Sequence, residues 1–444
     1  MASKVKSRRG TLIITWLFGI FIFIDDYFNS LTIGTVMRPV TDEQKVSRAK
    51  LAYILDSTAA PVSVLAPISS WVVTIMSIIK GSSGFEKLGV SEFTFFIMLI
   101  PINLYAILAI LMVLQSILRK DFGPMAVSEY RALKNLGLYD EKFGQPTGEI
   151  KEEKVIVKKN AKAIDMILPI LVLVGLAVIF FPVTTYLGAI DGENIHTFQE
   201  AVKSMTLKDA FNNTDASKAL FYAVIYTIVF SSIYFMIRGL LSIQKVGEAI
   251  ISGIKSMVPA LVILTLAWTI GSVIKLSPEE GGLGLSKFLS ELVISGGFPI
   301  WALPVVVFLV ASAISFSTGT SWGTFSIMIP ITMPIAIALA EKSGASLMNT
   351  SLVAIGAAIG GAIFGDHCSP ISDTTILSST GAGCPHLEHV ATQIPYAIFV
   401  MIVSAVGYLI AGIFDNPIAG LFSALIVFFI AYEIVKKIWK TKEI

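Results

Sequence analysis

The feature that most constrains this chain is a series of long apolar segments, several of them interrupted by polar residues, glycine or proline. A helix that crosses a bilayer needs about 20 mostly apolar residues. Uninterrupted segments of this kind are 92–118, 165–189, 217–237, 258–276, 391–413 and 417–435. Four further segments are apolar but interrupted, namely 11–48, 49–79, 298–341 and 347–380. The pattern predicts an all-α polytopic membrane protein.

Composition agrees with a membrane location. Charged residues make up 14% of the chain and apolar residues 55%, whereas soluble domains carry about 25% charged residues. The basic N-terminus precedes an apolar stretch that contains two aspartates and lacks a cleavage site, so we do not expect a cleavable signal peptide. The two cysteines cannot build a disulfide framework. The sequence shows no nucleophile–base pair, phosphate-binding loop or metal quartet. We therefore expect that the protein is not an enzyme, has no cofactor and binds no nucleic acid.

The placement of basic residues predicts the orientation in the membrane, because lysine and arginine near segment ends favour the cytoplasm. They gather at the N-terminus, in three internal stretches and at the C-terminus, which we all place on the cytoplasmic side of the cell membrane: residues 4–9, 38–50, 119–160, 238–255 and 436–440. A single crossing by 11–34 would put 38–50 outside. The conflict disappears if 11–48 is a re-entrant hairpin from the cytoplasmic side, and 298–341 then enters from the outside.

Each predicted hairpin is followed by an interrupted helix that crosses the membrane. Residues 67–70 read Pro-Ile-Ser-Ser and residues 370–373 read Pro-Ile-Ser-Asp, at matching places in the two interrupted helices. Two like units of opposite orientation are the inverted-repeat plan of secondary transporters. We therefore expect a first repeat, a cytoplasmic linker, a second repeat, and an extra helix with a basic tail, at 1–118, 119–160, 161–413 and 414–444.

The two predicted repeats differ in one respect. Three uninterrupted apolar segments precede the second hairpin within its repeat, whereas the first hairpin begins at residue 11. True repeats would therefore leave about three helices missing before the first hairpin. The sequence leaves open whether the chain is shortened or the halves differ.

The interruptions predict where the function lies, because irregular backbone at membrane depth is tolerated only where protein or a cavity covers it. Ionisable side chains in such segments are costly and usually functional. The candidates for ion and proton binding are Asp25, Asp26, Asp56, Asp366, Asp373 and His367. A buried carboxylate holds either a proton or a sodium ion, which is a minimal mechanism for antiport. The alternatives are helix capping for the aspartates, pairing of Asp25 or Asp26 with Arg38, and a structural hydrogen bond for His367.

The same segments carry uncharged oxygen ligands of the kind that hard cations prefer. Carbonyl ends of half-helices add a negative partial charge. The candidate ligands for sodium or substrate are Asn29, Ser30, Ser57, Thr58, Ser69, Ser317, Thr318, Thr320, Ser372 and Thr374. A zinc site built from Cys368, Cys384, His386 and His389 is disfavoured, because the cysteine spacing fits no compact finger. We expect no metal beyond transported sodium.

Residues 365–375 read Gly-Asp-His-Cys-Ser-Pro-Ile-Ser-Asp-Thr-Thr, and residues 378–382 read Ser-Ser-Thr-Gly-Ala. With the runs 25–38 and 56–71, this motif resembles the NhaC family of sodium/proton antiporters, part of a larger ion-transporter superfamily. The resemblance covers nearly the whole chain. It implies an elevator-like transport domain of hairpins and broken helices, a scaffold that forms a homodimer, and sodium and protons as substrates. Such proteins also include malate/lactate and amino-acid exchangers.

The leading hypothesis is exchange of sodium for protons, and the alternative is coupled exchange of an organic anion or amino acid. Dicarboxylate carriers of the superfamily place Ser-Asn-Thr at their hairpin tips, whereas residues 29–30 read Asn-Ser here and 317–320 read Ser-Thr-Gly-Thr. Arg38 is the only arginine placed to clamp a carboxylate, which favours the cation. A channel or a non-transporting sensor is a third class, which the titratable carboxylates disfavour.

Overall fold

The computed structural model describes residues 7–146, 161–190, 195–212, 214, 216–255 and 295–439, with isolated positions between 256 and 294. These residues form helices, turns and loops, and no strand occurs among them. Seven of the described helices are long and apolar enough to cross a membrane, or eight if the bent pair Glu92–Ile102 and Leu104–Leu133 is one span. The all-α polytopic class is therefore confirmed. The predicted helix 258–276 lies mostly outside the described residues.

The chain divides into two compact units. The larger contains Met1–Gly89, Phe96–Glu152 and Ile263–Ile444, and the smaller contains Val90–Phe95 and Glu153–Val262. Every candidate site residue belongs to the larger unit.

The first interrupted segments form two helices joined by a bend, followed by a helix that breaks. The bend joins α1 (Arg8–Phe21) to α2 (Asp26–Glu43), and the broken helix consists of α3 (Arg48–Ser57), α4 (Ala60–Ser63) and α5 (Ser70–Gly81). Prolines interrupt the chain between α3 and α5, because proline supplies no amide hydrogen. The helices α1, α3 and α5 each begin after a serine whose hydroxyl accepts an amide hydrogen of the first turn: Ser7, Ser47 and Ser69.

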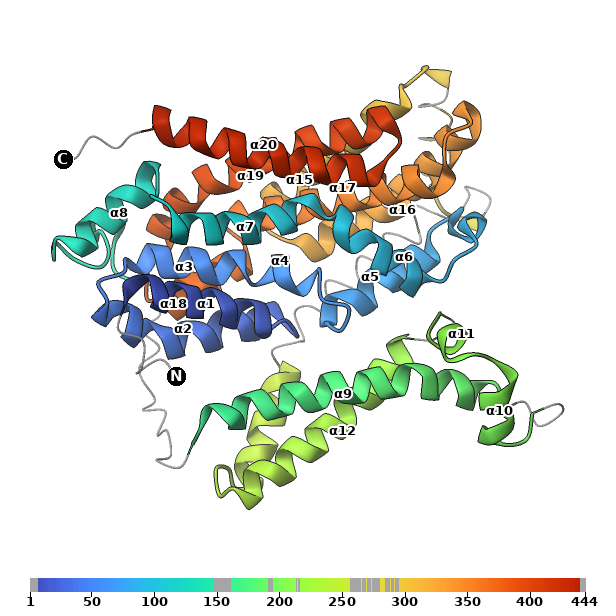
Figure 1. Ribbon diagram of the computed structural model, residues 1–444, viewed down its shortest axis with the longest axis horizontal. Helices are drawn as coiled ribbons and strands as arrows, with labels where there is room; N and C mark the ends of the chain where they lie inside the picture. Colours follow the sequence, from blue (N-terminus) through green and yellow to red (C-terminus); the bar gives the residue numbers. More distant parts are fainter. Residues whose placement is uncertain are drawn as a thin grey trace. The chain divides into compact units, whose positions relative to one another are not determined.

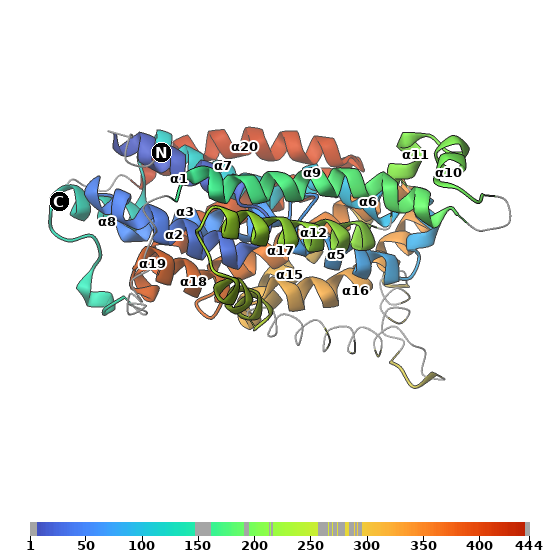
Figure 2. The ribbon, with the colours of Figure 1, turned by 90° about the horizontal axis from the view of Figure 1, so that it is seen from below.

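The second pair of interrupted segments has the same order of elements. A tight turn joins α15 (Leu303–Thr318) to α16 (Ser321–Ser343), and α17 (Leu347–Cys368) is separated from α18 (Asp373–Ala382) by a break. Both α15 and α16 pack against α17 (Figure 2). Gly319 at the turn has φ of +67°, and an added Cβ would lie 2.8 Å from Ile371 Cγ1. The tip of this hairpin is therefore in contact with the second break.

Close approach of helices holds these elements together. A Cβ at Gly361 on α17 would lie 2.3 Å from the carbonyl oxygen of Phe308 on α15. On α18, a Cβ at Gly381 would lie 2.8 Å from the carbonyl oxygen of Ser30 on α2. Helix α18 also packs against α3, so the second broken helix lies beside the first hairpin (Figure 1). The two breaks are thereby brought into one part of the unit.

The remaining helices of the larger unit are α7 (Leu104–Leu118), α8 (Gly123–Leu133), α19 (His386–Phe414) and α20 (Pro417–Ile438), together with the second half of α6 (Glu92–Leu99). The sequence predicted a spanning helix over 92–118, and the structure has helices along this segment with a bend between them. The segment bends by 45°, because Pro101 interrupts the hydrogen bonds and Asn103 caps α7. Helix α8 lies inside the stretch expected as a linker.

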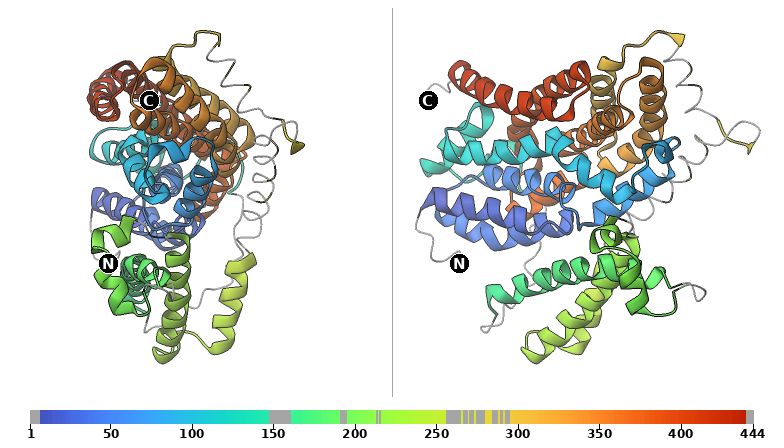
Figure 3. Two further views of the ribbon diagram at one scale, coloured as in Figure 1. Left: turned by 90° about the vertical axis from the view of Figure 1, so that its right-hand side faces the viewer. Right: turned by 45° about the vertical axis from the view of Figure 1, so that its right-hand side comes forward.

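The smaller unit consists of α9 (Ala163–Gly188), α10 (Phe198–Ser204), α11 (Leu207–Asn212) and α12 (Ala216–Ile237), with residues 243–255 also helical. Helices α9 and α12 pack along each other (Figure 3). Their bounds agree within two residues with the predicted spans 165–189 and 217–237.

Candidate ion-binding site

Two buried carboxylates lie at the carbonyl ends of half-helices. Asp366 is in the last turn of α17, and Asp56 is in the last turn of α3. Their exposed fractions are 2% and 1%. The carbonyl end of a helix carries a negative partial charge, which disfavours a second negative charge and favours a cation. These positions therefore fit cation binding better than helix capping.

Asp366 joins the hairpin tip to the second break. Ser321 Oγ, in the first turn of α16, donates to Asp366 Oδ2 over 2.7 Å. Ser372 Oγ, in the break, donates to Asp366 Oδ1 over 2.7 Å. Both carboxylate oxygens are thus held by neutral hydroxyls, which can turn their oxygens toward a cation when one replaces the hydrogen bonds.

Asp56 is held by the second broken helix and by α19. Its Oδ2 accepts from Gln393 Nε2 over 2.6 Å and from Thr375 Oγ1 over 3.0 Å. His389 Nε2 lies 3.7 Å from the same oxygen. The first break is therefore connected to α18 and α19 through one carboxylate.

Asp26 and Asn29 lie three residues apart on α2, and each has a buried oxygen without a hydrogen-bond partner among the described residues. These oxygens are Asp26 Oδ2 and Asn29 Oδ1. Trp71 lies close to Asp26, yet its Nε1 also lacks a hydrogen-bond partner within the described part of the chain. Side chains three apart face the same side of a helix. An unpaired buried acceptor costs free energy. A cation bound to the two oxygens would remove this cost, so they are candidate cation ligands.

Asn29 also closes the first hairpin. Its Nδ2 donates to the carbonyl oxygens of Gly19 over 2.7 Å, Ile22 over 2.8 Å and Thr58 over 3.0 Å. The end of α1, the start of α2 and the first break are thus fastened by a single amide group.

Asp373 and Asp25 are the more accessible of the predicted aspartates. Asp373 is exposed at the first position of α18, where it accepts from the Tyr27 hydroxyl and from the Thr374 amide. Asp25 is partly exposed and directly precedes α2. Asp26 interacts electrostatically with Asp25, Asp366 and Asp373, so these carboxylates share one region of the unit.

His367 is buried between two hydroxyl groups. Its Nε2 lies 2.9 Å from Ser57 Oγ, and its Nδ1 lies 2.8 Å from the Tyr105 hydroxyl. Both ring nitrogens are therefore occupied, which fits the structural alternative stated for this residue.

The predicted oxygen ligands fall into two groups. Ser372 donates to Asp366 and lies 3.0 Å from Thr374 Oγ1, and Ser30 on α2 accepts from Ser378 on α18. Ser57, at the end of α3, lies 2.9 Å from His367 at the end of α17 and so also connects the two broken helices. The others use their hydroxyls locally, as a helix cap or in bonds to backbone carbonyls: Thr58, Ser69, Ser317, Thr318 and Thr320. Ser317 and Thr318 are exposed.

The structure adds residues that the sequence reasoning missed. Ser321 and Thr375 bond to the site carboxylates, and Gln393 and His389 reach Asp56 from α19. His389 and Gln393 are four residues apart on one face of an apolar helix, and buried polar groups in a spanning helix are a signal of function. That spacing could have identified them.

Four aspartates of the site have no lysine or arginine partner in the part of the chain that the structure describes. Within the described residues, no lysine or arginine forms an ion pair with Asp26, Asp56, Asp366 or Asp373. Nor does any group of three or more His, Cys, Asp or Glu side chains able to hold a metal ion occur in this part of the chain.

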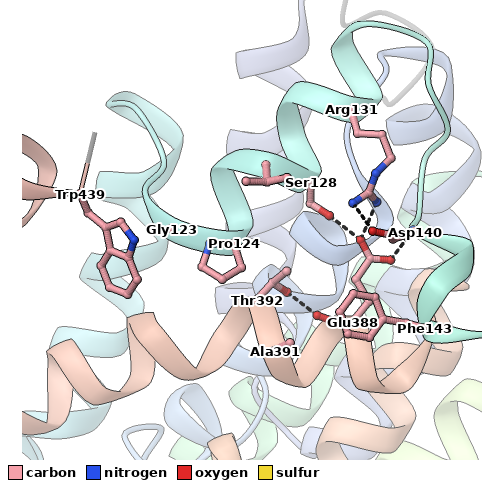
Figure 4. Close-up of a pocket in the computed structure, with 11 residues that line it drawn as sticks. Gly123, Pro124, Ser128, Arg131, Asp140, Phe143, Glu388, Ala391, Thr392 and Trp439 are labelled. Carbon is pink, nitrogen blue, oxygen red and sulfur yellow. Dashed lines mark hydrogen bonds and ion pairs between the residues drawn. The ribbon is translucent and has the colours of Figure 1, made fainter. Parts of the chain in front are cut away.

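Three arginines pair with acidic side chains at one end of the larger unit, which we call the arginine end: Arg8, Arg48 and Arg131. A pocket of about 390 Å3 lies there between α8 and the start of α19 (Figure 4). In it Glu388 accepts from Ser128, from Arg131 Nη1 and from the Asp140 amide. These charges are satisfied by one another, so the pocket adds no free ion ligand.

The chain matches the Na+/H+ antiporter family over residues 62–413, which include the second hairpin and most of both broken helices. It belongs to this family. The NhaC-type resemblance inferred from the 365–375 motif is thereby confirmed, and the family comprises transporters and not an enzyme class. Membership and the apolar helices together establish a multi-pass membrane protein of the sodium/proton antiporter type.

Individual relatives agree with the family. A Haemophilus influenzae protein with no functional name is 38% identical over 439 residues, which cover 98% of this chain and 77% of the relative. A second protein of that organism, named an uncharacterized Na+/H+ antiporter, is 34% identical over 166 residues, 37% of this chain and 32% of the relative. A malate-2H+/Na+-lactate antiporter of Bacillus subtilis is 38% identical over 105 residues, 23% of this chain and 20% of the relative.

Proposed function

We propose that this antiporter exchanges sodium for protons at the buried carboxylates of the two breaks. The observation that carries the proposal is the set of Asp26, Asp56 and Asp366, which are at least 98% buried and have no lysine or arginine partner among the described residues. Buried carboxylates without a counter-ion are too costly to remain ionised and empty. They bind either a proton or a metal cation, so uptake of one releases the other.

The contacts support different roles for the carboxylates. Asp366, with hydroxyls on both oxygens, and the unpaired oxygens of Asp26 and Asn29 offer oxygen ligands for sodium. Asp56 is bonded to an amide and a hydroxyl and has an imidazole 3.7 Å away. We assign sodium to the first group and the exchanged proton to Asp56. The two are coupled because the Asp56 carboxyl interacts electrostatically with that of Asp366, so a cation at Asp366 favours loss of the Asp56 proton.

The elements also support the proposed inverted repeats. The ends of the first hairpin lie at the arginine end, because Arg8 of α1 pairs with Glu129 and Ser47, after α2, donates to the same carboxylate. Helix α19 leads away from that end over 29 residues, which is about 43 Å of helix. Beyond it, the Asp415 carboxylate accepts from the amide of Ser346, directly before α17.

The second hairpin is therefore anchored at the opposite end. Trp301, before α15, packs against Gly412 near the end of α19. The late halves of the broken helices then reach across to the other hairpin: α18 packs on α2, and α5 packs on α16 with the rings of Trp71 and Trp322 5.0 Å apart. This exchange of partners is what two inverted units would produce.

Since the carboxylates are buried, transport requires a movement that opens the site to each side in turn. An elevator movement of hairpins and broken helices, a homodimeric scaffold and cytoplasmic termini remain predictions from the sequence. An organic anion is disfavoured, because Arg38, the arginine considered as a clamp for a carboxylate, does not lie at the second break. Its Nη1 would lie 3.0 Å from a Cβ added to Gly383, beyond the end of α18, which places Arg38 at the arginine end.

The test is transport by purified protein in liposomes without any organic solute. An inward sodium gradient should drive protons out of the vesicle, measured with a trapped pH-sensitive dye. A vesicle without protein is the control. If the dye responds only after malate, lactate or an amino acid is added, the cargo is organic and the proposal fails.

A further inference from the structure

We propose that His386, Ser379 and His389 form a proton relay that connects the arginine end with Asp56. The inference rests on the proposed function, because the relay would supply and remove the proton that sodium displaces. Asp56 itself is 1% exposed, so a proton needs hydrogen-bonded groups to reach it from water.

The three side chains form a nearly continuous chain of polar atoms. His386, the first residue of α19, is partly exposed, and its Nδ1 lies 3.1 Å from Ser379 Oγ. Ser379 Oγ lies 2.9 Å from His389 Nδ1. His389 Nε2 lies 3.7 Å from Asp56 Oδ2, so a shift of about 1 Å gives a hydrogen bond.

The outer partners determine where the imidazole protons lie. His386 Nε2 is 2.7 Å from the carbonyl oxygen of Pro370, which can only accept, so this nitrogen carries a hydrogen. His389 Nε2 is 2.8 Å from Gln393 Oε1, and the amide is oriented by its Nε2, which donates to Asp56. Both neutral imidazoles therefore present a bare Nδ1.

Those two bare nitrogens face the same hydroxyl. Ser379 Oγ has one hydrogen, which it can give to one imidazole or to the carbonyl oxygen of Thr375 at 2.7 Å. At least one Nδ1 is thus left without a donor, so a proton that enters here meets an acceptor nitrogen with no competing hydrogen. Each imidazole can therefore take up the proton in turn and pass it on.

The transfer can be written with every proton accounted for. The Nδ1 proton of cationic His386 passes to Ser379 Oγ, while the hydroxyl hydrogen passes to His389 Nδ1, which makes His389 the cation. The Nε2–H bond of His389 then breaks and the proton joins Asp56 Oδ2, which gives neutral His389 and a neutral carboxylic acid. Imidazole suits this task because it takes a proton on one nitrogen and releases another.

The charged groups packed around the relay bond to partners outside it. Glu388, the residue before His389, is held on the α8 side by Arg131 and Ser128 (Figure 4). From α3, Arg48 Nη1 donates to the carbonyl oxygen of Gly383, after α18, and Arg38 also lies close to this residue. His367 contributes its carbonyl oxygen to Gln393 and keeps its ring on Ser57 and Tyr105. Asp42 pairs with Arg48, Asp366 interacts electrostatically with Asp56, and the buried thiol of Cys384 follows α18.

The test compares two fluxes in the same liposomes: sodium-driven proton flux, and exchange of radiolabelled for unlabelled sodium, which needs no proton. His389→Gln should lower the proton flux at least about tenfold while sodium–sodium exchange stays within about twofold of the wild type. Ser379→Ala should act in the same way. His386→Ala should lower the proton flux, and imidazole added to the buffer should restore part of it. Ser404→Ala is the matched control, because Ser404 is a buried serine of α19 that bonds only its own helix.

Two results would overturn the relay. One is an equal loss of both fluxes in folded variants, which would mark a structural role. The other is unchanged proton flux in both histidine variants. A wild-type protein that moves no protons with sodium would instead overturn the proposed function, so the two failures are distinguishable.

Discussion

Replacing Asp366 with asparagine removes a buried charge and keeps the shape of the side chain. The amide oxygen can still accept from one of Ser321 and Ser372, and the other hydroxyl must rotate to accept from the new amide group. The expected cost in folding free energy is about 1–3 kcal/mol. The effect on sodium is larger: a carboxylate and a cation about 4 Å apart attract by about 4 kcal/mol at an effective dielectric constant of 20, about a thousandfold in Kd.

The assay separates these effects. Thermal unfolding in detergent reports folding, and the sodium concentration that gives half-maximal proton flux or half-maximal thermal stabilisation reports binding. Glu341→Gln is the control, because Glu341 forms an exposed ion pair with Lys87, and such pairs contribute about 0–1 kcal/mol. If folded Asp366→Asn protein binds sodium within about threefold of the wild type, Asp366 does not bind the cation and the assignment is refuted.

Two further predictions concern stability. Lys50 is fully buried and donates to Asp121 over 2.6 Å. Lys50→Met should therefore destabilise the protein by about 3 kcal/mol, measured by thermal unfolding in detergent, and an additional Asp121→Asn should recover part of the loss. An unchanged unfolding midpoint for the single variant would contradict the reasoning. In the smaller unit, the Arg238 guanidinium holds the pKa of the Asp165 carboxyl well below its usual range, so the pair stabilises the fold at neutral pH and the contribution is lost as the pH falls below about 4, the usual pKa of aspartate. Asp165→Asn should remove this acid sensitivity, and equal acid-induced unfolding of variant and wild type would argue against it.

Local signals were sufficient for most of the helices. Apolar length located α9, α12, α19 and α20, because a spanning helix satisfies its own backbone and needs only an apolar surface. Proline and glycine located the breaks, since they remove hydrogen bonds or permit positive φ. The same signal was overlooked at Pro101, where the segment bends, and the polar stretch after residue 118 concealed α8.

The sequence by itself determined that this chain is a helical membrane protein with two broken helices rich in carboxylates, because helix length and the cost of buried charge depend on local residue pattern. Only the tertiary structure decided which groups meet. Ser321 reaches Asp366 across 45 residues and Gln393 reaches Asp56 across 337. Such pairings follow from the packing of α17 against α16 and of α19 against α3, which no local pattern encodes. The same packing places His389 beside Asp56. The sequence suggested this histidine only as part of a disfavoured zinc site, and its position beside Asp56 is the basis for the proposed proton relay.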